Sequence, residues 1–140
     1  MPARICRIMS TAALPRRAFA LLFALVWWVN GLLYKVLDLV PRHREIVGSI
    51  LGEDHALALT RAIGFGELLF GLWILSQWKW RWSATAQIIA VLTMNVIEFV
   101  LVPELLLFGR LNAFVALAYC SVVAYAGFIH SPPAAKPRPA

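Results

Sequence analysis

Charged residues are scarce in this sequence of 140 residues, at 14% of the total, whereas hydrophobic residues make up 61%. Water-soluble globular domains usually carry about 25% charged and about 45–50% apolar residues. The composition therefore excludes an ordinary water-soluble domain and favours a membrane protein. The net charge of +6 does not indicate nucleic-acid binding, because the basic residues gather in the tails and in one short turn rather than on one face.

Cysteine is also scarce, and the motifs of common enzymes are missing. Cys6 and Cys120 are the two cysteines, and with no CxxC pair they exclude a disulfide framework and dithiol chemistry. The sequence has no glycine-rich phosphate loop, no Ser–His–Asp constellation and no nucleophile elbow. None of the three histidines lies in the middle of an apolar run, so no pair is placed to ligate haem. The sequence therefore offers no catalytic constellation.

Four long apolar runs organise the chain, at residues 18–40, 56–77, 82–102 and 111–129. Each is close to the roughly 20 residues that a helix needs to cross a bilayer. We predict an all-α fold, an integral membrane four-helix up-down bundle. A basic segment precedes the first run, as in a signal peptide. However, the run continues through WWVNGLLYKVLDLV with no small-x-small site, so we predict a retained helix rather than a cleaved leader.

The remaining segments flank or connect these runs. We expect residues 18–129 to form one domain, with a flexible basic segment at 1–17 and a disordered Pro-rich tail at 130–140. The stretch PRHREIVGSILGEDHA predicts a short amphipathic helix between the first and second spans. Its apolar side consists of Ile46, Val47, Ile50 and Leu51. The alternative for this stretch is a metal site made by His43, Glu45, Glu53, Asp54 and His55. Their spacing is not diagnostic, so we predict no metal site.

Lysine and arginine predict the orientation of the bundle. Four crossings place one group of basic residues on the same side: Arg4, Arg7, Arg16, Arg17, Lys79, Arg81, Lys136 and Arg138. Basic loops face the cytoplasm. We therefore expect a multi-pass protein of the cell inner (cytoplasmic) membrane with both termini cytoplasmic. In the stretch QWKWRW, we expect Trp78, Trp80 and Trp82 to anchor a tight turn at head-group level.

Polar side chains interrupt the apolar runs, and antiparallel threading brings them to one level in the outer half of the bundle. They predict a polar intramembrane pocket formed by Asn30, Lys35, Asp38, Arg61, Glu67, Asn95, Glu98, Arg110 and Asn112. The inner half is nearly free of charge. Ionisable groups inside a membrane are costly and point to function. The alternative is a buried ion-pair network that fixes helix register, with the outermost charges snorkelling to the interface.

Glu67 has the most informative surroundings. Gly64, Glu67 and Gly71 share one helical face, and glycines let a neighbouring helix approach, so we expect Glu67 to face another helix. Lys35 and Asp38, three residues apart, are expected to pair on one helix. With Glu104 counted, acids exceed bases by one in this region. Glu67, the deepest acid, is therefore expected to hold a proton.

Three stretches are distinctive: VWWVNGLLYKVLDLVPRHREIV, LTRAIGFGELLFGLWIL and MNVIEFVLVPELLLFGRLN. They contain N-G-x-x-x-K at 30–35, Gly–Glu at 66–67, N-x-x-E-F at 95–99 and PELLLFGRxN at 103–112. Together they resemble the DoxX-like family over most of the chain. The resemblance implies a compact four-helix bundle in the bacterial cytoplasmic membrane. The family is named after a subunit associated with quinone-linked sulfur oxidation, and its pattern contains no known catalytic set to carry over.

Three functions follow from these observations and stay open at this point. The first is a non-catalytic or accessory component of a membrane redox system, whose pocket suits a quinone head group. The second is a small transporter or proton-handling protein, although the charge-free inner half argues against an open pore. The third is a scaffold or assembly factor. The expected partners are the lipid bilayer, other membrane subunits or a second copy of the chain, with no nucleic acid and no cofactor other than the quinone.

Overall fold

The computed structural model describes residues 15–106 and 108–130, and no strand occurs among them. Its long helices are α1 (Arg16–Trp28), α2 (Arg42–Leu51), α3 (Ala56–Ser76), α4 (Trp80–Leu101) and α5 (Asn112–Ala124). Two π-helices extend the first and last of these, η2 (Val29–Val36) and η6 (Tyr125–Ile129). Short 3₁₀ turns form the remaining connections: η3 (Glu53–His55), η4 (Pro103–Leu105) and η5 (Gly109–Leu111).

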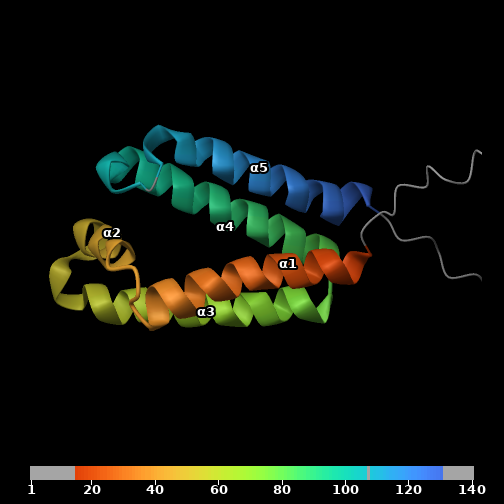
Figure 1. The fold of residues 1–140 in the computed structure, drawn as a ribbon, viewed down its shortest axis with the longest axis horizontal. Helices are drawn as coiled ribbons and strands as arrows, with labels where there is room; N and C mark the ends of the chain where they lie inside the picture. The colour runs from red at the N-terminus through yellow and green to blue at the C-terminus, as the bar shows by residue number, and fades with distance from the viewer. Residues whose placement is uncertain (1–14, 107, 131–140) are drawn as a thin grey trace, which may run out of the picture.

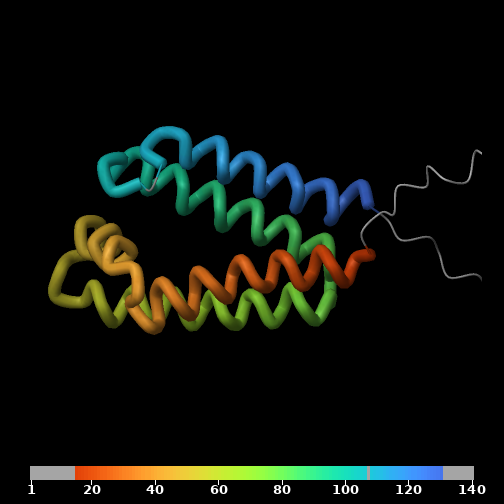
Figure 2. Tube along the Cα trace, in the orientation of Figure 1, coloured from red at the N-terminus to blue at the C-terminus, as the bar shows by residue number. Residues whose placement is uncertain are grey.

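Four helical stretches are long and apolar enough to cross a membrane: Arg16–Val36, Glu53–Ser76, Trp80–Leu101 and Gly109–Ile129. They run up and down in chain order, and α2 connects the first stretch to the second at one end of the bundle (Figures 1 and 2). The predicted four-helix membrane bundle is confirmed. The predicted flexible segment at 1–17 and disordered tail at 130–140 lie almost entirely outside the described residues. Of the segment 1–17, Arg16 and Arg17 belong to α1.

The helices associate as two pairs. The first span, α1 with η2, packs along α3, and α4 packs along α5, whereas α3 and α4 touch little after the turn that joins them. Figure 1 shows the two pairs meeting at the end where the described chain begins and ends. At the other end they are further apart, and α2 packs on α3 there.

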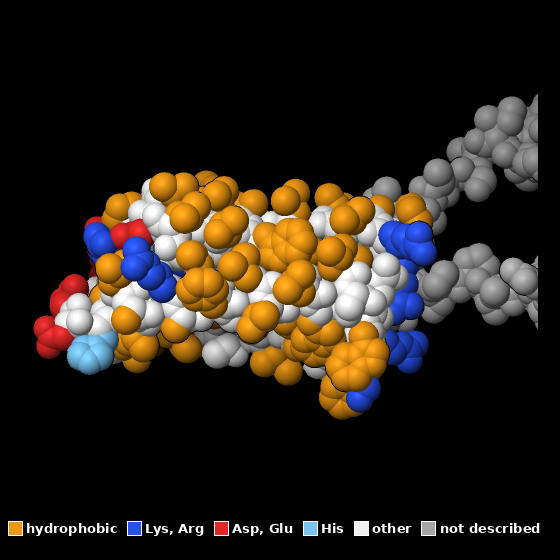
Figure 3. Space-filling view, turned by 90° about the horizontal axis from the view of Figure 1, so that it is seen from below, with side chains coloured by type: hydrophobic (Ala, Val, Ile, Leu, Met, Phe, Trp, Pro, Cys, Tyr) orange, Lys and Arg blue, Asp and Glu red, His pale blue; other side chains and the backbone are white. Residues whose placement is uncertain are grey.

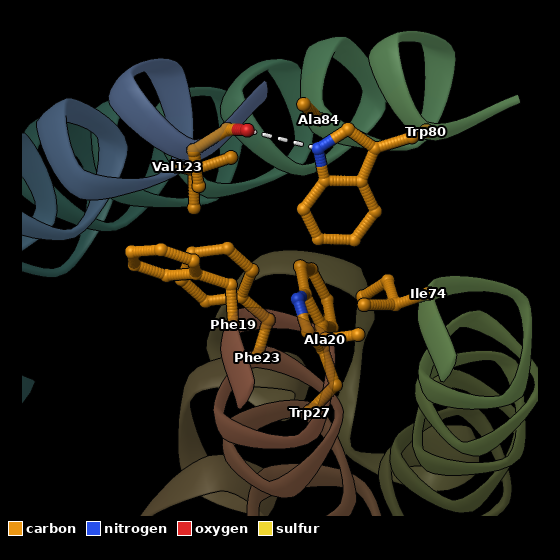
Figure 4. Packing of buried hydrophobic residues seen from close by; sticks show 9 residues of the cluster. Phe19, Ala20, Phe23, Trp27, Ile74, Trp80, Ala84 and Val123 are labelled. Carbon is orange, nitrogen blue, oxygen red and sulfur yellow. Dashed lines mark hydrogen bonds between the residues drawn. The ribbon is translucent and has the colours of Figure 1, made fainter. Parts of the chain in front are cut away.

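The hydrophobic core lies near the end where the two pairs meet. Phe19, Phe23 and Trp27 of α1 contact Ile74 in the last turns of α3 and Trp80 in the first turn of α4 (Figure 4). Ala84 of α4 and Val123 and Ala126 from the last spanning stretch complete it. The Trp80 indole donates a hydrogen bond to the Ala126 carbonyl oxygen, at 2.9 Å. All four spans are therefore tied together at this end.

Charge divides the two ends of the bundle, and a belt of hydrophobic side chains covers the face between them (Figure 3). We call the end that carries Arg16, Arg17, Lys79 and Arg81 the basic end. The opposite end, the mixed end, combines basic and acidic residues: Arg42, Arg44, Glu45, Glu53, Asp54, Glu104 and Arg110. Large apolar side chains of the spans, such as Leu69 and Phe114, are exposed between the ends. Such a belt is expected of a protein that contacts lipid.

The structure corrects one prediction about the tryptophans. Trp78 and Trp82 are 63% and 69% exposed, as interfacial anchors should be, but Trp80 is 6% exposed and belongs to the core. The reason is that α4 begins at Trp80, directly after Gln77 and Lys79 turn the chain in the left-handed conformation (φ 57° and 47°). Two positions along a helix rotate a side chain by about 200°, so Trp80 and Trp82 point in opposite directions.

Candidate functional site

A close contact between the first span and α3 positions the charged residues of the mixed end. A Cβ atom added at Gly31 would lie 2.7 Å from the Gly64 carbonyl oxygen, and one added at Gly64 would lie 2.7 Å from the Gly31 carbonyl oxygen. Each glycine is therefore required for the backbones to approach. At Gly71, on the same face of α3, the Trp28 indole occupies the space that a Cβ atom would need, whereas no described residue lies within 4 Å of the Cβ position of Gly66.

Lys35 and Glu67 form an ion pair across this contact. The Lys35 ammonium group binds Glu67 Oε1, and the two residues are only 4% and 6% exposed. Glu67 thus faces another helix, as the glycine spacing predicts. The premise that Glu67 is an uncompensated acid, from which we expected it to hold a proton, is wrong because Lys35 supplies the opposite charge. Glu67 Oε2 is buried and has no hydrogen-bond partner among the described residues.

The predicted pairing of Lys35 with Asp38 is also wrong. The first span ends as a π-helix, and its last hydrogen bonds run from Leu37 N–H to the Leu32 carbonyl and from Leu39 N–H to the Leu33 carbonyl. Asp38 then adopts the left-handed conformation, with φ 52°. These features remove Asp38 from the helical face of Lys35. Instead, Arg44 Nη1 donates to Asp38 Oδ2 at 2.6 Å.

Two residues at the start of α2, Arg42 and His43, lie near these charges, and they were not among the predicted pocket residues. The positive charges of Lys35 and Arg42 both act on His43, and both also act on Glu98 of α4. Burial is the main cause that lowers the pKa of His43 from 6.5 to about 4, followed by the charges of Lys35 and Arg42. The His43 ring stacks on the Tyr34 ring, with centroids 5.5 Å apart. Nε of Arg42 and Nδ1 of His43 are buried without partners among the described residues.

We call Lys35, Glu67, Glu98, Arg42 and His43 the mixed-end cluster. It joins groups from the first span, α2, α3 and α4. Its available chemistry is a buried charge pair together with unpartnered nitrogen and oxygen atoms that can donate to or accept from a ligand. Arg42 and His43 follow directly after the turn that ends the first span, but hydrophobic periodicity gives no signal for the direction in which α2 folds.

The other predicted pocket residues lie elsewhere. Asn112 donates to Asn95 Oδ1 at 3.0 Å, which joins α5 to α4. Asn30 donates to the Val26 carbonyl of its own helix, at 2.9 Å. Arg61 is exposed, and neither Arg61 nor Arg110 makes a salt bridge with a described residue. Arg110 instead lies over the Phe99 ring, 5.9 Å from its centroid. The structure thus gathers Lys35, Glu67 and Glu98 of the predicted set, with Asp38 at the edge of the cluster.

A second polar network, without charge, lies deeper in the bundle and was not predicted. The Trp27 indole donates to Gln87 Oε1 at 3.3 Å and to the Tyr119 hydroxyl at 3.1 Å, and that hydroxyl donates to Gln87 Oε1 at 2.8 Å. Gln87 is fully buried. The network links α1, α4 and α5, so it satisfies the polar atoms of a core glutamine while holding the two helix pairs together.

The residues of the alternative metal site lie in α2 and in the 3₁₀ turn η3. Within residues 15–106 and 108–130, no three histidine, cysteine, aspartate or glutamate side chains gather closely enough to hold a metal ion. Glu53, Asp54 and His55 are exposed. The carboxylate of Glu53 instead packs on Gly48 of α2.

Four apolar helices define a small integral membrane protein, in which two glycines bring the first span and α3 close enough for the Lys35–Glu67 ion pair. The chain belongs to the DoxX-like family, whose sequence model matches residues 24–124. Comparison with curated proteins and with solved structures gives no match. The resemblance expected from the three sequence stretches is therefore confirmed at the level of the family.

Proposed function

We propose that this DoxX-like protein is a non-catalytic, accessory component of a redox system in the bacterial inner membrane, and that the mixed-end cluster holds the head group of a quinone. One observation carries the proposal. A buried ion pair lies beside unpartnered polar atoms, Glu67 Oε2, Arg42 Nε and His43 Nδ1. Buried polar atoms are nearly always paired, so those left over mark a place where a ligand can complete the bonding.

The chemistry of a quinone head group matches what the cluster leaves unpaired. Its carbonyl oxygens accept hydrogen bonds, which the Arg42 Nε–H group can donate. In the reduced form its hydroxyl groups donate, and Glu67 Oε2 can accept. The stacked rings of Tyr34 and His43 offer a flat aromatic surface for a planar ring. Ligand sites commonly combine such apolar walls with a few convergent polar groups.

The proposed orientation places the mixed end outside and the basic end in the cytoplasm. Arg16, Arg17, Lys79 and Arg81 lie at the basic end without an acidic residue in the first turns of α1 and α4. Positive residues accumulate on the cytoplasmic side of membrane proteins. The quinone would then enter from the outer half of the bilayer. An accessory role also implies a partner, either another membrane subunit or a second copy of this chain.

The test is quinone binding by the full chain in lipid nanodiscs, measured as quenching of tryptophan fluorescence by a short-chain benzoquinone. Arg42→Gln removes a donor without touching the Lys35–Glu67 pair. We expect it to weaken binding about tenfold, the equivalent of one hydrogen bond to a charged group. Glu45→Gln is the matched control, because Glu45 is exposed on the same helix. Its affinity should stay within about twofold, as is usual for surface positions.

Two results would overturn the proposal. One is quenching that rises linearly with quinone and never saturates, because it reports partition into lipid. The other is equal loss of affinity in Arg42→Gln and Glu45→Gln, because it would show that binding does not depend on the Arg42 donor in particular. A third outcome would favour the transporter alternative. In it, neither the wild type nor Arg42→Gln binds quinone, the wild type conducts protons in liposomes, and Arg42→Gln abolishes that flux.

A further inference from the structure

The turn between α3 and α4 lines a pocket at the basic end that the mixed-end cluster does not involve. The pocket is a shallow surface hollow with a volume of about 380 Å³. Its lining includes Arg16, Lys79, Trp80, Arg81, Trp82 and His130. Among the described residues, no acidic side chain lines it. Several positive charges therefore share one concave surface with no described acid to neutralise them, which favours an anion.

Arg16 is held in place and keeps a free donor. Its guanidinium carbon lies 5.0 Å from the centroid of the buried Trp80 ring, and Nη2 donates to the Gln77 carbonyl oxygen at 3.4 Å. Nε of Arg16 is buried and has no partner among the described residues. A guanidinium fixed by an aromatic ring presents its remaining N–H groups in a planar fork, which matches the oxygens of a phosphate.

The first turn of α4 lines the same pocket with Trp80, Arg81 and Trp82. The first backbone bond of the helix runs from Ser83 N–H to the Lys79 carbonyl, at 3.1 Å. The N–H groups of these three residues therefore precede the helical ladder, and within the described residues no side chain caps the start of the helix. The positive end of a helix of 22 residues attracts negative charge.

The surroundings of the pocket favour a lipid as the source of the anion. Trp82 lines it and is exposed, as indole is at the level of lipid head groups. Gly127 of η6 also lines it, and the next residues of η6, Phe128 and Ile129, expose apolar side chains. A ligand here meets cations at its polar end and hydrocarbon-like surface beside it. Basic pockets between spanning helices are known to bind anionic lipid head groups.

We propose that this pocket binds the phosphate group of an anionic glycerophospholipid, with Arg16 as the residue that selects it. This binding is independent of the proposed quinone site at the other end of the bundle. It differs from general attraction to a charged membrane because it depends on the position of Arg16 rather than on the number of positive charges.

The test is lipid binding by the full chain in a neutral detergent, counted by native mass spectrometry after addition of phosphatidylglycerol or phosphatidylcholine. Both lipids carry a phosphate, but only phosphatidylcholine adds a positive charge, which the cations of the pocket repel. Arg16→Gln should reduce the preference for phosphatidylglycerol about tenfold, because it removes the cation beside the phosphate. Arg17→Gln is the matched control. It removes the same charge from the neighbouring, exposed position of α1, which does not line the pocket, and should leave the preference within about twofold.

Arg81→Gln guards against a folding artefact, because Arg81 lines the pocket but is exposed and packs on nothing in the core. It should also reduce the preference while leaving the near-ultraviolet circular dichroism of the tryptophans unchanged. Equal losses in Arg16→Gln and Arg17→Gln would refute the site, because they would show that only net charge matters. Displacement of the lipid by inorganic phosphate at millimolar concentration would refute the lipid assignment in favour of a site for soluble phosphate.

Discussion

Replacing both members of the buried ion pair should be far less harmful than replacing either one. Lys35 and Glu67 are 4% and 6% exposed, so each single change leaves a charge without water or a counter-ion. Breaking a buried pair in this way costs about 3–5 kcal/mol. Lys35→Met and Glu67→Leu together replace the pair by apolar side chains of similar size, which is often neutral or stabilising. We therefore expect a coupling energy of at least about 3 kcal/mol.

The measurement is reversible unfolding in mixed micelles of rising SDS content, followed by tryptophan circular dichroism, for the wild type, both single variants and the double variant. Asp38 and Arg44 supply the control cycle, because their side chains are 17% and 41% exposed although their hydrogen bond is well formed. Water screens such a pair, and its coupling should be below about 1 kcal/mol. The reasoning would be refuted if the double variant of Lys35 and Glu67 lost as much free energy of unfolding as the two single variants together.

Further predictions concern backbone contact, the core and pH. Gly64→Ala should destabilise by about 1–3 kcal/mol because its Cβ meets a carbonyl oxygen, whereas Gly66→Ala should be neutral or stabilising by up to about 1 kcal/mol, since nothing lies near its Cβ. Chemical or thermal unfolding compares them. Trp80→Phe should cost about 1–3 kcal/mol by leaving a buried carbonyl unpaired, and Trp82→Phe less than about 0.5 kcal/mol. Because the pKa of His43 is lowered in the folded protein, the unfolded chain binds the proton more tightly. The free energy of unfolding should therefore be highest above pH 6.5 and should decrease as the pH drops towards about 4. Because the ring is partly exposed, this loss should be on the order of 1 kcal/mol, and it should be absent in His43→Gln over the same titration.

The sequence was sufficient to predict the spans, because length and hydropathy alone decide whether a helix can cross a bilayer. It also predicted the direction in which Glu67 points. The spacing of Gly64, Glu67 and Gly71 lies within one regular α-helix, where side-chain phase is reliable. The close backbone approach at Gly64 is the structural outcome of that pattern.

The partner of Lys35 could not be predicted in the same way. Lys35 lies in a π-helix, in which the hydrogen bonds skip one more residue than in an α-helix, so α-helical phase no longer gives the direction of Asp38. Arg42 and His43 enter the cluster only because α2 folds back over α3, and hydrophobic periodicity carries no information on that packing. Trp80, by contrast, could have been separated from Trp82 if the helix start at Lys79 had been recognised.

The aromatic core and the mixed-end cluster lie at different ends of this bundle. The aromatic core that joins all four spans lies at the basic end. The mixed-end cluster lies where the two helix pairs are further apart (Figure 1) and where buried polar atoms lack partners among the described residues. A region with few buried apolar contacts opens at lower free energy than the core. Under the proposed function, exchange of a quinone head group at the mixed end would therefore not require the core contacts of Trp80 and Phe23 to open.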